Sequence, residues 1–417
     1  MPAGRRPPPR RLPLVYFGLA YAALLLALAA VALEPGKASG FFLTPYTVFA
    51  VHLVTLGWIV HSIIGAFYLA APLALRMEFP AGRGDAWVCA FVAIGASGVA
   101  AHFWIEEYSG IAYAGVMLLL CFEWLLRRVR RALKESPIER GTKAIITIAW
   151  SNLTGTAFLG LLLAINKTYP ILPGTHYQSV FGHAHLGLVG FASLMLIGVG
   201  LRMLPIALPA RPPDERHAFR ILIPIQVGVI GAVLAWLFAP SLARWASIPI
   251  AFGLLYFLGV VIGMLRNRLP APPARRRPDI GMLHAMQALL YLAVAIGIGL
   301  SLVFTETLLT DRMLAYGVIV LLGFLGQAIL GVSMRLLPMY GWLRDGADGD
   351  HEEMPASPST GPVRALQITC FVLWTAGVPA LAWGMSQHVE AWVQAGAWSL
   401  FAAVVAAGLA SLRAPTT

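Results

Sequence analysis

Long apolar stretches separated by short polar ones are the dominant pattern along this chain. Twelve of them reach the roughly 17–25 residues that an α-helix needs to cross a bilayer. Their expected limits are 12–34, 45–75, 86–105, 111–128, 143–165, 178–205, 219–239, 245–265, 281–304, 313–339, 363–384 and 391–412. The pattern therefore predicts an all-α membrane protein with twelve transmembrane helices, surrounded by the lipid bilayer.

Within these stretches one motif occurs three times, each copy 133 residues after the last. The copies are His52-x4-Gly57-x7-Gly65-x6-Pro72, His185-x4-Gly190-x7-Gly198-x6-Pro205 and Val318-x4-Gly323-x7-Gly331-x6-Pro338. The apolar stretches shift onto one another by the same interval, which indicates a repeated structural unit. We expect one membrane domain over 1–417, built from four-helix repeats at about 12–142, 143–278 and 279–412. These repeats would form three arcs around an axis along the membrane normal.

Composition supports the membrane class. Only 12% of the residues are charged and the mean hydropathy is +0.75, whereas soluble domains carry about 25% charged residues. The three cysteines lie singly in apolar stretches, and there is no Cys-x-x-Cys-His motif. Neither a disulfide framework nor covalent attachment of c-type haem is expected.

The net charge of +11 reflects membrane topology rather than nucleic-acid binding, because the basic residues lie between the apolar stretches. With the N-terminus in the cytoplasm, only four of the thirty Lys and Arg residues fall on the outer side: Lys37, Lys167, Arg244 and Arg312. This distribution follows the positive-inside rule. It predicts a bacterial inner-membrane protein with both termini in the cytoplasm. Residues 1–11 would be a basic cytoplasmic tail, and 343–362 an acidic cytoplasmic loop.

Histidines within the apolar stretches are the main candidates for chemistry, because a polar side chain in hydrocarbon usually has a partner or a function. His52 and His185 occupy the same repeat position near the outer ends of their spans, and imidazole binds haem iron, copper and zinc. His183 lies about 200° around a regular helix from His185. One of the two would be the ligand and the other a supporting hydrogen-bonding group. His61 lies about 180° from His52 on a regular helix and would face elsewhere or serve another depth.

The glycines and arginines of the repeat are supporting candidates, each with two interpretations. Gly57 and Gly190 either allow helices to pack closely or leave room for a flat cofactor. Arg202 and Arg335 precede the repeat proline by three residues, near the cytoplasmic ends. They either extend their charge to the membrane surface or pair with an anion.

The twelve spans, the cytoplasmic N-terminus, the three arcs and His52 together resemble subunit I of the haem–copper oxidase superfamily, which includes the nitric oxide reductases. The stretches Gly182-His-Ala-His-Leu-Gly187 and Arg202-Met-Leu-Pro205 are also similar to NnrS-type haem- and copper-containing membrane proteins. The resemblance implies a b-type haem at His52, with His183 or His185 in the place of a copper ligand. The family's further histidines, in the seventh and tenth spans, have no counterpart here. A complete oxygen-reducing centre is therefore not expected.

Three functional hypotheses follow. The first is a redox or gas-binding protein, related to NO or O2, with haem b held by His52 and His185. A separate cytochrome c or quinol would then donate the electrons. The second is a membrane copper- or metal-binding protein, or an NnrS-like protein of nitric oxide stress. The third is a permease or scaffold without a cofactor. The sequence specifies neither a substrate nor an oligomeric state.

Overall fold

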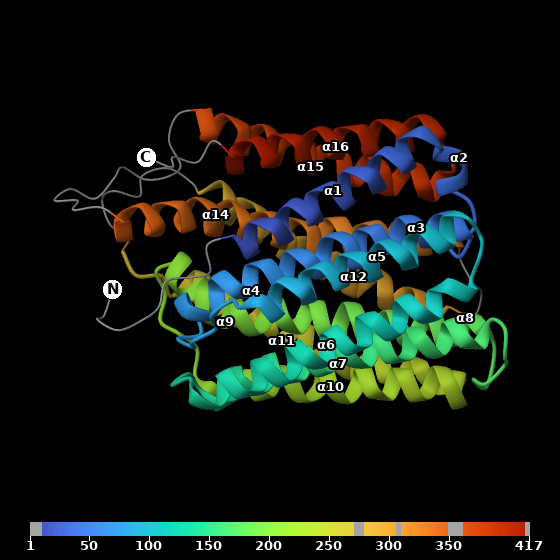
Figure 1. Ribbon diagram of the computed structural model, residues 1–417, viewed down its shortest axis with the longest axis horizontal. Coiled ribbons are helices and arrows are strands. Elements are labelled where there is room, and N and C mark those ends of the chain that lie inside the picture. Colours follow the sequence, from blue (N-terminus) through green and yellow to red (C-terminus); the bar gives the residue numbers. More distant parts are fainter. Residues whose placement is uncertain (1–10, 271–278, 306–309, 349–361, 413–417) are drawn as a thin grey trace. The chain divides into compact units, whose positions relative to one another are not determined.

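The computed structural model describes residues 11–270, 279–305, 310–348 and 362–412, and this part of the chain is almost entirely helical (Figure 1). Twelve of its helices are long and apolar enough to cross a membrane. Their limits follow the predicted ones closely; the fourth and the tenth differ most, because their helices continue to Glu135 and Asp348. The predicted helical membrane class and the number of spans are thus confirmed. Residues 1–10 of the expected basic tail and 349–361 of the expected acidic loop, including His351, lie outside the described residues.

The helices belong to two compact units, each described by itself. Unit 1 (Met1–Ala70, Arg276–Ala295, Leu309–Thr417) contains α1 (Leu12–Leu33), α2 (Pro35–Ala38), α3 (Pro45–His52), η1 (Leu53–Val60), most of α4 (His61–Leu73) and of α12 (Ile280–Phe304), α13 (Thr310–Val318), η4 (Ile319–Gly326), α14 (Gln327–Asp348), α15 (Pro362–Gln387) and α16 (Glu390–Leu412). Unit 2 (Ala71–Arg275, Ile296–Leu308) contains α5 (Arg83–Trp104), α6 (Ser109–Glu135), α7 (Arg140–Asn166), α8 (His176–His185), η2 (Leu186–Ser193), α9 (Leu194–Ala207), α10 (Glu215–Phe238), η3 (Pro240–Leu242) and α11 (Ala243–Arg266).

Three of the long helices change from α to π geometry for eight residues. The π-helices η1, η2 and η4 start at Leu53, Leu186 and Ile319, again 133 residues apart. They begin directly after His52, His185 and Val318, the first residues of the three motif copies. A π-helix is rare, is usually only a single turn, and is frequent at functional sites. The repeat is therefore present in the backbone geometry as well as in the sequence.

The glycines of the motif lie where its helix packs against the preceding span of the same repeat. A Cβ added at Gly57 would lie 2.6 Å from Ala23 Cβ, and one added at Gly331 would lie 2.6 Å from the Gly281 carbonyl oxygen. Equally close approaches occur at the other repeat glycines: Gly190 to Asn152, Gly198 to Ile145, and Gly323 to Tyr291. The space that these residues leave is occupied by a neighbouring helix, as in other close helix pairs in membranes.

The repeat prolines differ in their effect. The helix ends one residue after Pro72 in the first copy and two residues after Pro205 in the second. In the third copy α14 continues past Pro338 to Asp348. The helix therefore ends close to the repeat proline in two copies only. A proline removes one helical hydrogen bond, which a helix can tolerate.

His388 lies in the turn between α15 and α16 and connects this turn to two other segments of unit 1. Its Nδ1 lies 2.7 Å from the Ser39 carbonyl oxygen and its Nε2 lies 2.9 Å from Asp311 Oδ1. Both partners can accept hydrogen bonds, so these contacts favour the doubly protonated, positively charged imidazole. The hydrogen bond to Asp311 and then the one to Ser39 raise the pKa of His388 above its usual value of 6.5.

The glycine contacts predict a selective loss of stability. Gly331→Ala should lower the free energy of unfolding by about 1–3 kcal/mol, because its Cβ meets backbone atoms that cannot rotate away. Gly259→Ala is the control, since nothing lies within 4 Å of its added Cβ. Thermal unfolding in detergent compares the two variants. Equal melting temperatures would contradict the packing role of Gly331.

The His388 contacts predict a pH-dependent part of the stability. Because the folded protein raises this pKa, the stabilisation is complete below the unfolded pKa and is lost as the pH rises through the folded one. His388 and Asp311 are about half exposed, with side-chain exposures of 48% and 57%, so the effect should stay below about 1 kcal/mol. The melting temperature of wild type should therefore fall slightly from pH 6 to pH 8 relative to His388→Gln. Parallel pH profiles for the two proteins would exclude this role.

Candidate functional site

His52, in unit 1, is the last residue of a short helix with a well-defined start. The Thr44 side chain accepts a hydrogen bond from the Thr47 backbone N–H at 3.2 Å, and Pro45 occupies the first helical position, a typical helix start. The ring Nδ1 of His52 lies 2.8 Å from the Val48 carbonyl oxygen. A carbonyl only accepts, so Nδ1 carries the proton and Nε2 carries the lone pair.

His185, in unit 2, repeats this arrangement. Its helix, α8, starts with a capping box between Thr175 and Gln178, which satisfies the first backbone N–H groups. The ring Nδ1 of His185 lies 2.8 Å from the Phe181 carbonyl oxygen, four residues earlier. The two histidines thus share the repeat position, the tautomer, the hydrogen-bond length and the π-helix that follows.

His183 faces another side of the same helix. A Cβ added at Gly160 of α7 would lie 2.9 Å from His183 Cε1, so this imidazole packs against α7. Residues 183 and 185 both belong to the regular α-helix α8, which places their side chains about 200° apart. The sequence does not decide whether His183 or His185 is the candidate ligand. The structure gives them different contacts: His183 packs against α7, whereas His185 is hydrogen-bonded to Phe181.

The expected direction of His61 assumes a regular α-helix, whereas the eight residues between it and His52 form the π-helix η1. A helix with i→i+5 hydrogen bonds turns less per residue than an α-helix with i→i+4 hydrogen bonds. The separation of about 180° that a regular helix would give therefore does not apply across η1. His61 is buried, and its Nδ1 lies 2.7 Å from the Leu56 carbonyl oxygen within η1.

Side chains from neighbouring helices bind the carbonyl groups of the π-helices. In unit 2, Asn152 Nδ2 donates to the Gly190 carbonyl oxygen at 2.7 Å, and Asn152 and Gln226 exchange two amide hydrogen bonds at 2.8 and 3.2 Å. In unit 1, Trp374 Nε1 donates to the Leu322 carbonyl oxygen at 3.0 Å. These residues fix the π-helices in an apolar environment, where unpaired polar groups are costly.

Asn152 and Gln226 were not predicted from the sequence. Both are uncharged amides isolated in apolar spans, and that isolation is the sequence feature that indicates a hydrogen-bonding role. The π-helices themselves leave no mark in the hydrophobic pattern.

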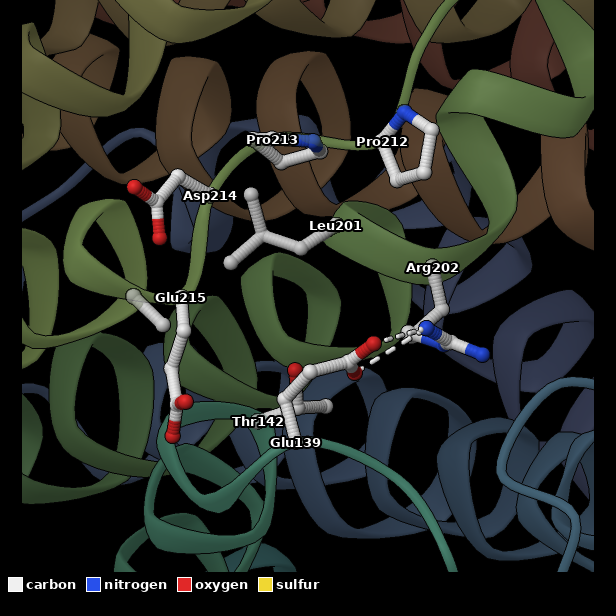
Figure 2. Close-up of a pocket in the computed structure, with 9 residues that line it drawn as sticks. Glu139, Thr142, Leu201, Arg202, Pro212, Pro213, Asp214 and Glu215 are labelled. Atoms are coloured by element: carbon white, nitrogen blue, oxygen red, sulfur yellow. Dashed lines mark hydrogen bonds and ion pairs between the residues drawn. The ribbon is translucent and has the colours of Figure 1, made fainter.

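The two repeat arginines pair with carboxylates that precede the first helix of their repeat. Arg202 Nη1 lies 2.7 and 3.0 Å from the two carboxylate oxygens of Glu139, and Arg335 Nε lies 3.1 Å from Asp279 Oδ2. Figure 2 shows the Arg202–Glu139 pair at a small pocket of unit 2, with Asp214 nearby. The pocket volume of about 20 Å³ is close to that of one water molecule.

Within the described ranges, no group of three or more His, Cys, Asp or Glu side chains is arranged to hold a metal ion. The histidines His52 and His185 lie in different units and are candidates individually. No protein-family model matches the chain, and no curated protein matches it either.

The hydrogen bonds of Asn152 at η2 predict that replacing it by leucine, which has nearly the same size, lowers the stability of the protein. Asn152→Leu leaves the Gly190 carbonyl and the Gln226 amide without their partner, which should cost about 1–3 kcal/mol of stability. Ser151→Ala is the matched control, because the adjacent Ser151 is exposed and should change stability by about 0.5 kcal/mol or less. Thermal unfolding of both variants in detergent measures the difference. A neutral Asn152→Leu would show that the amide contacts do not support η2.

Proposed function

We propose that this protein is a redox or gas-binding protein of the bacterial inner membrane that binds b-type haem, with His52 and His185 each as a candidate ligand. Its charge distribution supports cytoplasmic termini, since 4 of the 30 Lys and Arg residues fall on the outer side in that orientation. In the same orientation both histidines lie toward the outer side of their spans. The three motif copies would belong to three four-helix repeats.

One observation carries the proposal: the two histidines have the same local chemistry at the same repeat position. Each holds its Nδ1 on a carbonyl oxygen four residues earlier, at 2.8 Å. Histidines that ligate metals usually donate their other ring N–H in this way, which orients the ring and strengthens the coordinating nitrogen. Imidazole with this tautomer could bind haem iron through Nε2. Two histidines that served only to fill space between helices would not need the same hydrogen bond at the same repeat position.

When bound, haem would supply one-electron redox chemistry or a site for NO or O2. The chain's own residues do the rest. Val48 and Phe181 orient the two imidazoles through their carbonyl groups. The apolar spans limit the access of bulk water. Electrons would come from a separate cytochrome c or quinol. The seventh and tenth spans lack the histidines that the oxidase family has there, which argues against a complete oxygen reductase.

His185 is favoured over His183 as the ligand of unit 2. His183 packs against Gly160 of α7, whereas His185 repeats the hydrogen bond of His52. His183 then supports the helix pair rather than the haem. Copper binding or a cofactor-free permease would be the alternative function, and the same experiment separates them.

The test is the visible spectrum of the protein purified in detergent. Wild type should show a Soret band and reducible α and β bands. His52→Ala and His185→Ala should each lose most of the absorbance or shift it to a different ligation state, because each removes an axial nitrogen. His183→Ala, two residues from His185, and His388→Ala should keep the wild-type spectrum.

The outcomes are distinct. Haem retained unchanged in both His52→Ala and His185→Ala overturns the ligand assignment. A colourless protein with stoichiometric copper supports the metal-binding alternative. A protein with neither group supports the permease or scaffold. Metal and haem analysis of the same preparation, with protein quantified by amino-acid analysis, distinguishes these cases.

A further inference from the structure

Three buried side chains at the junction of η1 and α4 have polar atoms without a hydrogen-bond partner. Trp58, His61 and Ser62 are 0%, 2% and 1% exposed. Trp58 Nε1, His61 Nε2 and Ser62 Oγ lack a partner among the residues that the structure describes. Buried polar groups in proteins are nearly always hydrogen-bonded, to the protein or to ordered water. Three exceptions within five residues therefore indicate a bound ligand.

The chemistry of these atoms identifies the class of ligand. His61 Nδ1 donates to the Leu56 carbonyl oxygen, so Nε2 carries a lone pair and accepts. Trp58 Nε1 can only donate, and Ser62 Oγ can donate or accept. A ligand that satisfies this group must donate and accept within a small space. Water does both, and buried water typically makes about three hydrogen bonds to such groups.

The three residues lie close together along the chain. Trp58 lies in the last turn of η1, and His61 and Ser62 begin α4, so the three side chains leave adjoining turns of one helix. Aromatic rings of unit 1 lie beside them: the Tyr16 ring centroid is 5.8 Å from that of His61, and the Trp374 centroid is 5.7 Å from that of Trp58. The polar atoms therefore lie among side chains that exclude bulk solvent.

The second repeat shows that packing does not require polar groups at these positions. The residues 133 positions later are Phe191, Leu194 and Met195, all apolar and buried. The same backbone geometry, a π-helix followed by an α-helix, occurs there in unit 2. The polar triad is thus a property of the first repeat and not of the fold.

The third repeat has a related polar residue. Gln327 follows η4 as His61 follows η1, and it is fully buried. Its Oε1 is hydrogen-bonded to His284, while Gln327 Nε2 and His284 Nε2 have no partner among the described residues. Both π-helices of unit 1 therefore lead into a buried side chain with an unsatisfied nitrogen.

We propose that Trp58, His61 and Ser62 form a binding site for ordered water inside unit 1, with His61 Nε2 as its proton-accepting atom. The site begins in η1 and continues into α4, and its His61 lies nine residues after His52. Water bound there can pass a proton to or from His61 without opening the helix packing. The site does not depend on the proposed haem.

The probe is D2O. The Cε1 proton of histidine exchanges slowly with solvent deuterium, at a rate that depends on its protonation and on its contact with water, and mass spectrometry of peptides reads each histidine separately. His61 should exchange within about tenfold of the half-exposed His388 in the same sample. Exchange at His61 that is slower than that of His388 by about a hundredfold or more would overturn the proposal.

Replacements taken from the second repeat make the test specific. Trp58→Phe and Ser62→Met introduce the residues found at Phe191 and Met195. Each should slow exchange at His61 by about threefold or more, while His388 keeps its wild-type rate. Met195→Ser, at the matching position of unit 2, is the control and should leave His61 unchanged.

Ser62→Ala is the second variant if Ser62→Met does not fold, because it removes the same hydroxyl with less change of volume. An unchanged exchange rate at His388 shows that unit 1 is intact. If Ser62→Ala and Trp58→Phe both fold and His61 exchanges as in wild type, these side chains hold no water in contact with His61 and the proposal is wrong. A visible spectrum without haem would overturn the proposed function but would not affect this result.

Discussion

A transmembrane helix must satisfy its backbone N–H and C=O groups from within the protein, because hydrocarbon offers no partners. The three π-helices change the regular pattern of these bonds in the middle of a span. Side chains complete it: His61 binds the carbonyl of Leu56, Trp374 that of Leu322, and Asn152 that of Gly190. These three side chains therefore serve as partners of an irregular backbone. The close glycine contacts bring the neighbouring helix near enough to provide them.

The π-helices also determine which side chains share a side of the helix. In a regular helix nine residues separate two side chains by about half a turn, and a run of i→i+5 hydrogen bonds changes that separation because each residue turns less. His52 and His61 border such a run, η1, so their relative direction does not follow from α-helical spacing. The glycine within each π-helix faces the preceding span. Each copy therefore has one position before and one position after its π-helix that can carry a polar side chain.

The hydrophobic pattern predicted the twelve spans well, because length and apolarity alone determine whether a segment can cross a bilayer. The equivalence of His52 and His185 was also visible, since it needs only a fixed interval. The direction of His61 was not predictable, because an apolar stretch such as Leu53–Val60 reads the same as α-helix or π-helix. The carboxylate partners of Arg202 and Arg335 were missed as well. Glu139 and Asp279 lie in loops, and their pairing depends on how the helix ends approach.

The three copies separate the scaffold from the chemistry. Glycines at matching positions and an eight-residue π-helix occur in every copy, whether or not a histidine precedes it. The bordering residues vary: His52, His185 and Val318 before the π-helix, and His61, Leu194 and Gln327 after it. Since Val318 and Leu194 are compatible with the same backbone, neither border needs a polar side chain for folding. An imidazole in an apolar span that the fold does not require is costly to retain in a membrane, and that cost is the physical reason to assign these histidines a role beyond packing.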